Sequence, residues 1–324
     1  MLSLAQKICN RLLAPFFDIM GLYLTYEFRP LYAASDYRQA DPIRDLSDVA
    51  IVLQGPIEAW NEFTLNSVLL YRRWWPAATL ILSTWDDEDP AMLRTIEQTG
   101  AKIVLNKKPS NPGLKNINFQ IATSYAGMLR AKAVCSKYAI KARTDQRFCS
   151  PSAAPFLIES LELFPFAGQC NQTARVGCLS LNTFKKRIYG VSDMTIFGHI
   201  DDMLRYWGCE PDARMLTVED MPSQGDAQAY AKSRICEVYL SSHFLESIGK
   251  ALLWTDEDSL NAFRDHFIII DSAQVDLIWP KYTRRESRWK SYALEAPFDE
   301  LTFSDWVRLV VRSLDRSRHN ALLQ

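Results

Sequence analysis

Three short apolar runs follow one another in the sequence, and a segment with helical periodicity separates each run from the next. The runs are residues 49–53 (VAIVL), 78–83 (ATLILS) and 101–105 (AKIVL). Continuous apolar runs of this length are typical of strands buried on both faces of a sheet. We expect one helix at residues 61–75 and a second helix that Asp89 caps, Pro90 opens and Gly100 ends. This β-α-β-α-β order predicts a parallel sheet with right-handed crossovers.

Residues 137–148 (KYAIKARTDQRF) are predicted to add a fourth strand that ends in charged side chains. Apolar and charged side chains alternate up to Arg143, and Asp145 and Arg147 follow. Ligands of open α/β sheets bind at the carboxyl ends of the strands. A carboxylate between two guanidinium groups suits a phosphorylated or metal-bound ligand. The alternative is a structural ion-pair network at the end of a strand.

The rest of the chain continues the α/β pattern. Further helices are expected at residues 116–132, 153–164, 194–207, 233–249 and 305–323, and further strands at residues 173–181, 186–191 and 266–271. The predicted fold class is α/β, with a mostly parallel, doubly wound sheet flanked by helices and with peripheral helices at both termini. Residues 210–228 are acidic and lack clear periodicity, which is typical of a mobile lid or an acceptor loop.

The composition excludes several classes of protein. With 324 residues and a net charge of −1, the chain can bury a sizeable core, and binding to nucleic acid is not expected. Its seven cysteines are never spaced as C-x-x-C and its four histidines form no metal-binding motif, which argues against a disulfide framework and a histidine-ligated metal. The sequence also lacks the G-x-G-x-x-G, G-x-x-x-x-G-K-[ST] and G-x-S-x-G motifs of dinucleotide-binding proteins, P-loop enzymes and α/β-hydrolases.

An apolar stretch near the N-terminus bears on where the protein is located. Residues 12–26 are apolar, but Pro15 and Asp18 interrupt them, and the stretch is too short to cross a bilayer. Such a segment either packs as an ordinary helix or lies on a membrane surface. We expect a cytoplasmic protein and leave open a peripheral contact at the inner face of the cytoplasmic membrane.

Two basic stretches near the C-terminus leave similar alternatives. Residues 281–290 (KYTRRESRWK) suit a diphosphate, an anionic acceptor or lipid headgroups, or they form a solvated charged face. In the expected C-terminal helix, Arg308, Arg312 and Arg316 flank an apolar stripe. That helix either docks on the core or anchors to anionic lipid.

Polar residues follow the first, second and fourth strands, and the carboxyl ends of parallel strands share one edge of a sheet. The candidate donor- and nucleotide-binding residues are Gln54, Gly55, Pro56, Thr84, Asp86, Asn116, Asn118, Arg143 and Arg147. An acidic residue such as Asp86 suits a ribose or a base, and it equally suits a helix cap. Asn116 and Asn118 open the helix expected at residues 116–132 and either contact a ligand or act as caps. Asp145 is the candidate ligand of a divalent cation, Mg²⁺ or Mn²⁺, which would stabilise a departing diphosphate.

Six short motifs, taken together and in this order, are similar to those of a known family. They are IVLQGPI (51–57), ILSTW (81–85), KARTDQR (141–147), VSDMTIFG (191–198), EVYLSSHFLESIG (237–249) and IIIDSAQVDLIWPKY (268–282). The sequence resembles the WavE-type lipopolysaccharide synthesis family, whose members look like glycosyltransferases of the GT-A fold. The resemblance implies a glycosyltransferase domain at residues 48–285, between an N-terminal helical and linker segment (1–47) and a C-terminal amphipathic helical segment (286–324).

The same resemblance implies roles for individual residues. Asp145 falls where GT-A enzymes carry the first carboxylate of an Asp-x-Asp metal motif, but the third position here is Arg147. The diphosphate is then held either by a divalent cation with mostly water ligands or by Arg143 and Arg147. An inverting transfer needs a carboxylate base near the acceptor hydroxyl. Asp193 and Glu237 are the candidates for this base, and their alternatives are a helix cap and a buried ion pair, respectively.

These patterns predict a glycosyltransferase that moves a sugar from a nucleotide-sugar donor to a glycan or glycolipid acceptor of a bacterial lipopolysaccharide or capsule-like surface glycan. One alternative is a non-catalytic nucleotide- or glycan-binding component of a polysaccharide assembly complex, which the missing second aspartate favours. Another alternative is a nucleotidyl- or phosphotransferase on a similar sheet, which would release pyrophosphate or form a phosphorylated product.

Overall fold

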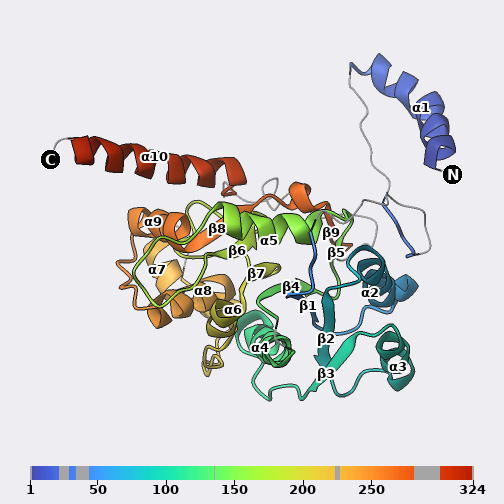
Figure 1. The fold of residues 1–324 in the computed structure, drawn as a ribbon, viewed down its shortest axis with the longest axis horizontal. Coiled ribbons are helices and arrows are strands. Elements are labelled where there is room, and N and C mark those ends of the chain that lie inside the picture. Colours follow the sequence, from blue (N-terminus) through green and yellow to red (C-terminus); the bar gives the residue numbers. More distant parts are fainter. Residues whose placement is uncertain are drawn as a thin grey trace.

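A seven-stranded sheet runs through the centre of the molecule (Figure 1). This computed structural model describes residues 2–21, 29–33, 44–134, 136–222, 227–280 and 300–322. In the order in which they pair, the strands are β3 (Lys102–Asn106), β2 (Thr79–Trp85), β1 (Val49–Gln54), β4 (Tyr138–Arg143), β7 (Ile196–His199), β6 (Val176–Leu179) and β8 (Phe267–Ile270). β7 is antiparallel to both of its neighbours, and the other neighbouring pairs are parallel. The sheet is therefore mostly parallel, as predicted.

The strand order reverses between β1 and β4. From β1 the chain builds β2 and β3 on one side, and it then places β4 on the other side of β1. In open α/β sheets the crevice for a ligand forms at the carboxyl ends of two strands at such a reversal. Gln54 ends β1 and is in register with Arg143, which ends β4. The fold thus places two predicted nucleotide-binding residues side by side.

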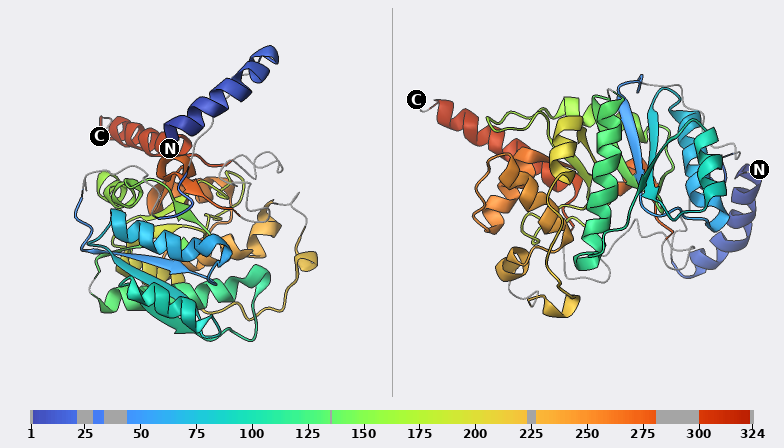
Figure 2. Two further views of the ribbon diagram at one scale, coloured as in Figure 1. Left: turned by 90° about the vertical axis from the view of Figure 1, so that its right-hand side faces the viewer. Right: turned by 90° about the horizontal axis from the view of Figure 1, so that it is seen from below.

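Helices cover both faces of the sheet. They are α2 (Phe63–Trp74), α3 (Pro90–Gln98), α4 (Ile117–Ala133), α5 (Ala153–Leu163), α6 (Ile200–Trp207), α7 (Ala227–Lys232), α8 (Cys236–Ser247) and α9 (Asp256–His266). α4 and α6 pack together on one face, and α5 lies over β6 and β7 on the opposite face (Figures 1 and 2). α4 approaches β1 so closely that a Cβ atom on Gly127 would lie 2.4 Å from Cγ1 of Val52. The sheet is enclosed as in doubly wound folds.

The first half of the sheet follows the sequence pattern closely. All six residues of β1 are buried, as its continuous apolar run predicts. In α3 the Asp89 side chain accepts a hydrogen bond from the backbone N–H of Ala91, and Pro90 is the first helical residue. Gly100 follows the end of this helix with φ +86°, a conformation that favours glycine. The predicted cap, start and end of α3 are confirmed.

Two elements predicted in the second half were wrong. Residues 186–191 form no strand, because their apolar side chains are buried in a loop in which Tyr189 has φ +55°. Residues 194–207 do not form one helix, because β7 occupies their first part. α6 begins only at Ile200, where the His199 side chain accepts a hydrogen bond from the backbone N–H of Asp201. A run of apolar residues therefore does not by itself distinguish a strand from a buried loop in this part of the chain.

Both segments that flank the expected domain contribute to its core. The guanidinium group of Arg147 donates hydrogen bonds to the backbone carbonyls of Pro30 and Leu31 at 2.8 and 3.0 Å. At the other end, α10 (Phe303–Leu322) carries Trp306, which is fully buried and donates to the carbonyl of Phe263 at 3.0 Å. Boundaries at residues 48 and 285 would thus cut through packed structure.

The two terminal helices extend from the same side of the molecule. α1 (Leu2–Ile19) stands apart from the sheet, and α10 runs outward from α9, both at the top in Figure 1 and in the left view of Figure 2. Within the described residues no helix is long and apolar enough to cross a membrane. The basic cluster at residues 281–290 lies outside the described residues, and so do residues 223–226 of the predicted lid.

Candidate functional site

The end of β1 turns sharply beside the end of β4. The backbone N–H of Gly55 donates to the carbonyl of Ser83 on β2 at 3.2 Å, and Gly55 has φ +121°, which favours glycine. A Cβ atom at this position would lie 3.0 Å from Oγ1 of Thr144. Gln54 is buried and donates to Oγ1 of Thr123 at 2.8 Å, while its Oε1 atom has no hydrogen-bond partner among the described residues. Gln54 therefore keeps one buried acceptor without a partner in the described part of the chain.

Arg143 and Asp145 form an ion pair at the end of β4. Nε and Nη2 of Arg143 donate to the two carboxylate oxygens of Asp145 at 2.7 and 2.9 Å. The indole N–H of Trp279 donates to Oδ2 of Asp145 at 3.0 Å, and the Arg143 guanidinium lies 5.5 Å from the centroid of the Trp279 ring. Trp279 directly follows β9 (Leu277–Ile278), which pairs with β5 (Arg147–Phe148). This small second sheet thus positions the indole against the ion pair.

This donor set does not fit a metal centre. Both oxygens of Asp145 already accept hydrogen bonds from Arg143 or Trp279. Among the residues that the structure describes, no group of three or more His, Cys, Asp or Glu side chains is placed to hold a metal ion. Mg²⁺ and Mn²⁺ bind best to several oxygen ligands. The arginine, rather than a second carboxylate, is the charged partner that the chain supplies to Asp145.

Lys141 is a buried basic residue in β4, two residues before Arg143. Its Nζ atom donates to the backbone carbonyls of Asp193 and Met194 at 2.8 and 3.3 Å, and it lies 3.4 Å from Oε1 of Gln120. The ammonium group also lies 4.9 Å from the centroid of the Trp207 ring. Burial lowers the pKa of Lys141 to about 7, because removal from water disfavours the charged form. Lys141 thus fastens the chain before β7 to the centre of the sheet.

Asp193 and Glu237 lie close enough for their charges to interact, with Lys141 and Arg143 nearby. Burial raises the pKa of Asp193, and the negative charge of Glu237 raises it further, against the effect of Lys141 and Arg143. Gln120 of α4 donates to Oδ2 of Asp193 at 2.9 Å. Asp193 is 5% exposed. The structure thus joins the two predicted catalytic carboxylates with the cluster at the end of β4.

Glu237, at the start of α8, has the opposite electrostatic environment. Burial would raise its pKa, but Arg187, the backbone N–H of Glu237 and the amide of Asn182 outweigh burial, so the pKa is lowered. Nδ2 of Asn182 donates to Oε1 of Glu237 at 2.5 Å, and Nη1 of Arg187 lies 3.6 Å from the same oxygen. The positive charge of Lys115 adds to this effect. Neighbouring carboxylates whose pKa values are pushed apart are typical of an acid–base site.

Arg147, a predicted phosphate ligand, lies elsewhere. Its side chain is 1% exposed, and besides the carbonyls of Pro30 and Leu31 it donates to Oγ of Ser67 and to the carbonyl of Phe63. Its pKa is lowered by burial. Four of its five guanidinium N–H groups are engaged in these bonds and the residue is buried, so Arg147 is not placed to bind a phosphate. This corrects the sequence-based assignment: Arg147 has a structural role.

The predicted residues at the end of β2 are only partly available to a ligand. Thr84 is buried, and its hydroxyl donates to Oε1 of Glu88 at 2.7 Å. Asp86 is exposed and its backbone N–H donates to the carbonyl of Asn106 at 2.9 Å. Pro56 is exposed in the turn after β1. The roles of these residues in binding a nucleotide stay predictions.

The two predicted asparagines at the start of α4 differ from each other. Asn116 is exposed and has φ +66° at the N-terminal end of the helix, where its side chain forms no capping hydrogen bond. Asn118 is 2% exposed and holds the chain at Asp212: its Nδ2 donates to the carbonyl of Asp212 at 2.8 Å, and its Oδ1 accepts from the backbone N–H of Asp212 at 2.6 Å. Asn118 is thus a structural clamp, and only Asn116 remains exposed to a ligand.

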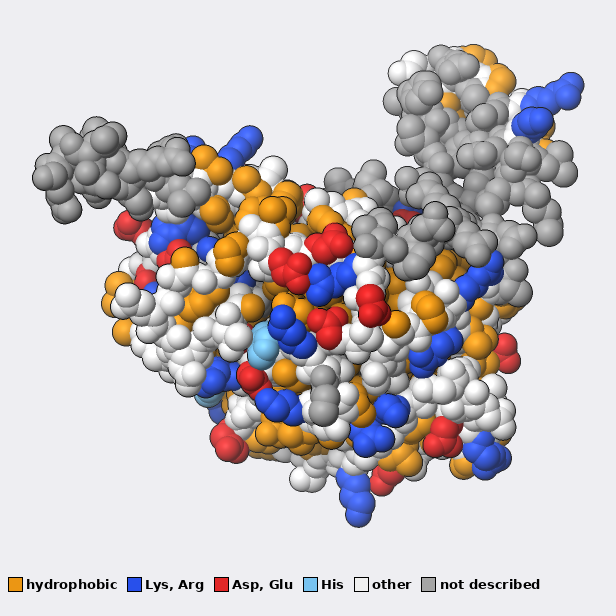
Figure 3. All heavy atoms as spheres, viewed as in Figure 1, with side chains coloured by type: hydrophobic (Ala, Val, Ile, Leu, Met, Phe, Trp, Pro, Cys, Tyr) orange, Lys and Arg blue, Asp and Glu red, His pale blue; other side chains and the backbone are white. Residues whose placement is uncertain are grey.

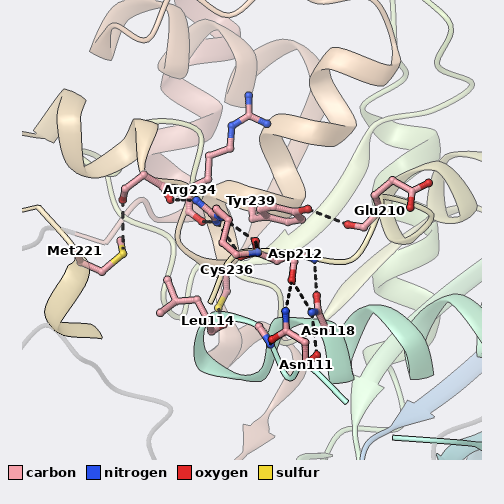
Figure 4. A network of polar contacts seen from close by, with 12 residues as sticks. Asn111, Leu114, Asn118, Glu210, Asp212, Met221, Arg234, Cys236 and Tyr239 are labelled. Carbon is pink, nitrogen blue, oxygen red and sulfur yellow. Dashed lines mark hydrogen bonds and ion pairs between the residues drawn. The ribbon is translucent and has the colours of Figure 1, made fainter. Parts of the chain in front are cut away.

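This clamp is part of a network that holds the first half of the predicted lid (Figure 4). Asn111 also donates to the carbonyl of Asp212, and the Tyr239 hydroxyl donates to the carbonyl of Glu210 at 2.9 Å. Arg214 pairs with the Asp212 carboxylate at 2.8 Å and donates to the carbonyls that precede α8. Residues 210–214 are therefore fastened between the start of α4 and the start of α8. The predicted mobility finds no support in this half.

Several members of the site were not singled out from the sequence. In the sequence Lys141 is one charged residue of an alternating strand, Asn182 follows the strand expected at residues 173–181, and Arg187 lies in the strand expected at residues 186–191, which does not form. Trp279 carried a usable signal, because it stands in one of the six motifs. The signal for Lys141 would have been a lysine in a strand expected to be buried on both faces.

Comparison with known proteins supports one assignment. Residues 49–245 match the family described as WavE lipopolysaccharide synthesis. Among curated proteins no match was found. One similar solved structure is a putative glucose-1-phosphate thymidylyltransferase from Bacillus anthracis in complex with a sucrose, with 11% sequence identity, 51% of this chain and 76% of that chain covered, and a TM-score of 0.31. At that TM-score the structural similarity carries no argument. The family match spans more than half of the chain and includes both candidate carboxylates, and the chain therefore belongs to the WavE lipopolysaccharide synthesis family.

Proposed function

We propose that the protein is a glycosyltransferase that moves a sugar from a nucleotide-activated donor to a bacterial surface glycan, a lipopolysaccharide or a capsule-like polymer. Membership in the family supports the synthesis of lipopolysaccharide. The observation that carries the proposed reaction is the pair of interacting carboxylates, Asp193 and Glu237, beside Arg143 at the reversal of strand order. Glycosyl transfer needs a base for the acceptor and a positive charge for the leaving diphosphate.

The two carboxylates suit different tasks. The raised pKa of Asp193 brings it toward the range in which a carboxylate accepts a proton efficiently, so Asp193 acts as the base that deprotonates the acceptor hydroxyl. Glu237 stays ionised next to Arg187 and Asn182, and its charge maintains the raised pKa of Asp193. In this assignment Glu237 tunes the pKa of Asp193, and Asp193 accepts the proton of the acceptor hydroxyl.

The diphosphate is assigned to Arg143. Its guanidinium group is partly exposed, with 24% of the side-chain surface accessible, and a planar guanidinium binds phosphate oxygens through two hydrogen bonds. A diphosphate at this position exchanges with Asp145 as the partner of Arg143, while Trp279 keeps its hydrogen bond to Asp145. The set of donors around Asp145 favours this arrangement over a divalent cation.

A non-catalytic nucleotide- or glycan-binding component is the second candidate. It is favoured by the fact that each carboxylate of the site already has a protein partner: Asp145 with Arg143, Asp193 with Gln120 and Glu237 with Asn182. A structural network of this kind would bind a ligand without turning it over.

The first experiment is a thermal-shift screen of nucleotides and nucleotide sugars, with and without Mn²⁺. A ligand that binds the folded state raises its melting temperature by mass action, so one screen identifies the donor and tests for the metal. The donor found is then assayed for release of nucleoside diphosphate with Asp193→Asn, Asp145→Ala and the exposed control Glu97→Gln.

Each outcome is informative. Release of nucleoside diphosphate that Asp193→Asn abolishes and Glu97→Gln retains supports the proposal. Binding without turnover in the wild-type protein identifies the non-catalytic component, and release of pyrophosphate identifies a nucleotidyltransferase. If Asp145→Ala changes neither binding nor transfer, the assignment of the donor site to the end of β4 is wrong.

A further inference from the structure

The N-terminal helix α1 exposes large apolar side chains along one face. Ile8, Leu12, Phe16 and Ile19 follow one another at spacings of three or four residues and are 49, 69, 60 and 87% exposed. Leu13 and Met20 extend this face and are 46 and 57% exposed. At about 100° per residue, these six side chains cover an arc of about 140° of the helix. We define them as the apolar face of α1.

Basic side chains occupy another sector of the same helix. Lys7 and Arg11 are both exposed and, at about 100° per residue, fall about 60° or more outside the apolar face. Figure 3 shows these two kinds of side chain, orange and blue, standing away from the body at the upper right. A helix with an apolar face and basic flanks is suited to lie in the plane of a membrane interface, with its cations at anionic headgroups.

The C-terminal helix presents a second, smaller contact on the same side of the molecule. The first turns of α10 pack against α9, through the buried Trp306. Farther along, Val311 is 48% exposed, and Arg308 and Arg312 are exposed, although Arg308 lies 3.9 Å from Asp305. Because α1 and α10 leave the body on the same side in both upright views, one flat surface can meet both helices (Figures 1 and 2).

We propose that α1, assisted by α10, docks the protein on an anionic lipid bilayer. The apolar face of α1 enters the boundary between headgroups and acyl chains, and Lys7, Arg11, Arg308 and Arg312 pair with lipid phosphates. A bilayer is the proposed partner because of charge. The described basic side chains beside these exposed apolar residues match an anionic surface. This docking does not depend on the reaction proposed for the site.

The first described residues after α1 are held in the body of the molecule, close to the site. Residues 29–33 follow α1 and are tied into the body, since Arg29 pairs with Asp276 at 2.6 Å and Pro30 and Leu31 accept hydrogen bonds from Arg147. Arg147 is two residues from Asp145. Docking through α1 therefore holds the body of the molecule, and with it the candidate site, at the bilayer, which matters for an acceptor that is part of a lipid.

The test is co-sedimentation of the full chain with vesicles. Vesicles of phosphatidylethanolamine and phosphatidylglycerol supply an anionic surface, and vesicles of phosphatidylcholine supply a neutral one. We expect the wild-type protein to bind the anionic vesicles at least about 10-fold more tightly, and binding to weaken as salt is raised. The variant Leu13→Glu/Phe16→Glu should lose at least about 10-fold in affinity, and Lys7→Glu/Arg11→Glu should lose the preference for anionic lipid.

Matched controls separate docking through α1 from non-specific binding of other exposed apolar side chains to the vesicles. Leu105→Glu/Leu129→Glu replaces two apolar residues that are similarly exposed, 51 and 47%, on β3 and α4. This variant should bind vesicles like the wild-type protein, and all variants should keep the wild-type melting temperature. The proposal is overturned if the wild-type protein does not sediment, if it binds both vesicle types equally, or if Leu105→Glu/Leu129→Glu weakens binding as much as Leu13→Glu/Phe16→Glu does. It is also overturned if light scattering shows that α1 joins two copies of the chain and that Leu13→Glu/Phe16→Glu separates them.

Discussion

The Lys141 ammonium group donates a 2.8 Å hydrogen bond to the backbone carbonyl of Asp193, 52 residues away in the sequence. This bond crosses from β4 to the chain just before β7, the strand that is antiparallel to its neighbours. The base proposed for the reaction is therefore positioned through its backbone by a lysine, while its side chain accepts a hydrogen bond from Gln120.

The buried lysine makes stability depend on pH in a defined window. Its pKa is lowered from 10.5 to about 7 in the folded protein, so between these values the unfolded chain binds a proton that the folded protein does not. The free energy of unfolding should therefore rise with pH from about 7 to about 10.5, by at most about 1.4 kcal/mol per pH unit from this group. Lys141→Met should remove that contribution, and the exposed control Lys107→Met should not.

Urea unfolding of the three proteins across this pH range measures the effect. The quantity to compare is the difference in unfolding free energy between the wild-type protein and Lys141→Met, because it isolates this residue from other titrating groups. A difference that stays constant between pH 7 and 10 contradicts the lowered pKa.

The two carboxylates should respond differently to neutralisation. Asp193→Asn removes the base, so turnover should fall about 100-fold or more while the affinity for the donor changes little. Glu237→Gln removes the charge that raises the pKa of Asp193, and it should shift the acidic limb of the pH–rate profile to lower pH. Steady-state kinetics over a pH series distinguishes these results, and an unchanged profile for Glu237→Gln would remove its tuning role.

The two arginines near Asp145 form a matched pair for mutation. Arg143→Lys keeps the charge but loses the planar double contact, so binding of nucleoside diphosphate should weaken about 10-fold with little loss of stability. Arg147→Lys cannot satisfy the four acceptors around it and should destabilise the fold by a few kcal/mol. Isothermal calorimetry and urea unfolding measure both quantities, and the reverse pattern would return Arg147 to the site.

Removal of divalent cations tests the donor set at Asp145. Because Arg143 and Trp279 engage both oxygens of this carboxylate, we expect nucleotide binding to survive EDTA within about 2-fold. Thermal shifts with and without EDTA provide the comparison. Loss of the shift in EDTA, followed by its recovery with Mn²⁺, would show that the site rearranges to hold a metal.

Asn118 should control the order of residues 210–214. Asn118→Ala leaves the backbone N–H of Asp212 without its buried acceptor, while Asn111 still donates to the carbonyl, and the cost should be about 2 kcal/mol. Proteolysis and hydrogen exchange should then increase in this segment. The exposed residue Gln98, at the end of α3, serves as the control through Gln98→Ala. Equal protection of the segment in both variants would contradict a clamping role.

An element could be predicted from the sequence where local contacts determine its structure, and could not where contacts with distant residues do. The order β1 to β4 was predictable because β1, β2 and β3 are apolar runs, β4 alternates apolar and charged side chains, and α3 carries its own cap and stop. β7 was not predictable, because Ile196–His199 runs directly into α6, and its pairing with the distant strands β4 and β6 makes it a strand. The predicted strand at residues 186–191 failed because burial in a loop produces the same apolar pattern.

The residues of the site also differ in whether local sequence or distant contacts determine their role. Arg143, Asp145, Asp193 and Glu237 were predictable as polar residues in recognisable motifs, and the fold brings them together. Arg147 could not be assigned from sequence, because its acceptors include the carbonyls of Pro30 and Leu31, more than 100 residues earlier. Lys141 likewise depends on carbonyls that belong to a distant loop.

The hydrogen bonds from Arg147 to the carbonyls of Pro30 and Leu31 limit where this protein can be cut into stable fragments. A fragment cut at residues 48 and 285 would strand a buried cation without two of its acceptors, and it would uncover the surface that Trp306 fills. Such a fragment should be insoluble on expression, whereas one from Arg29 to the first turns of α10 retains these contacts. The part of the chain that keeps these contacts is thus larger than the span of the six motifs, because it includes residues 29–33 and the first turns of α10.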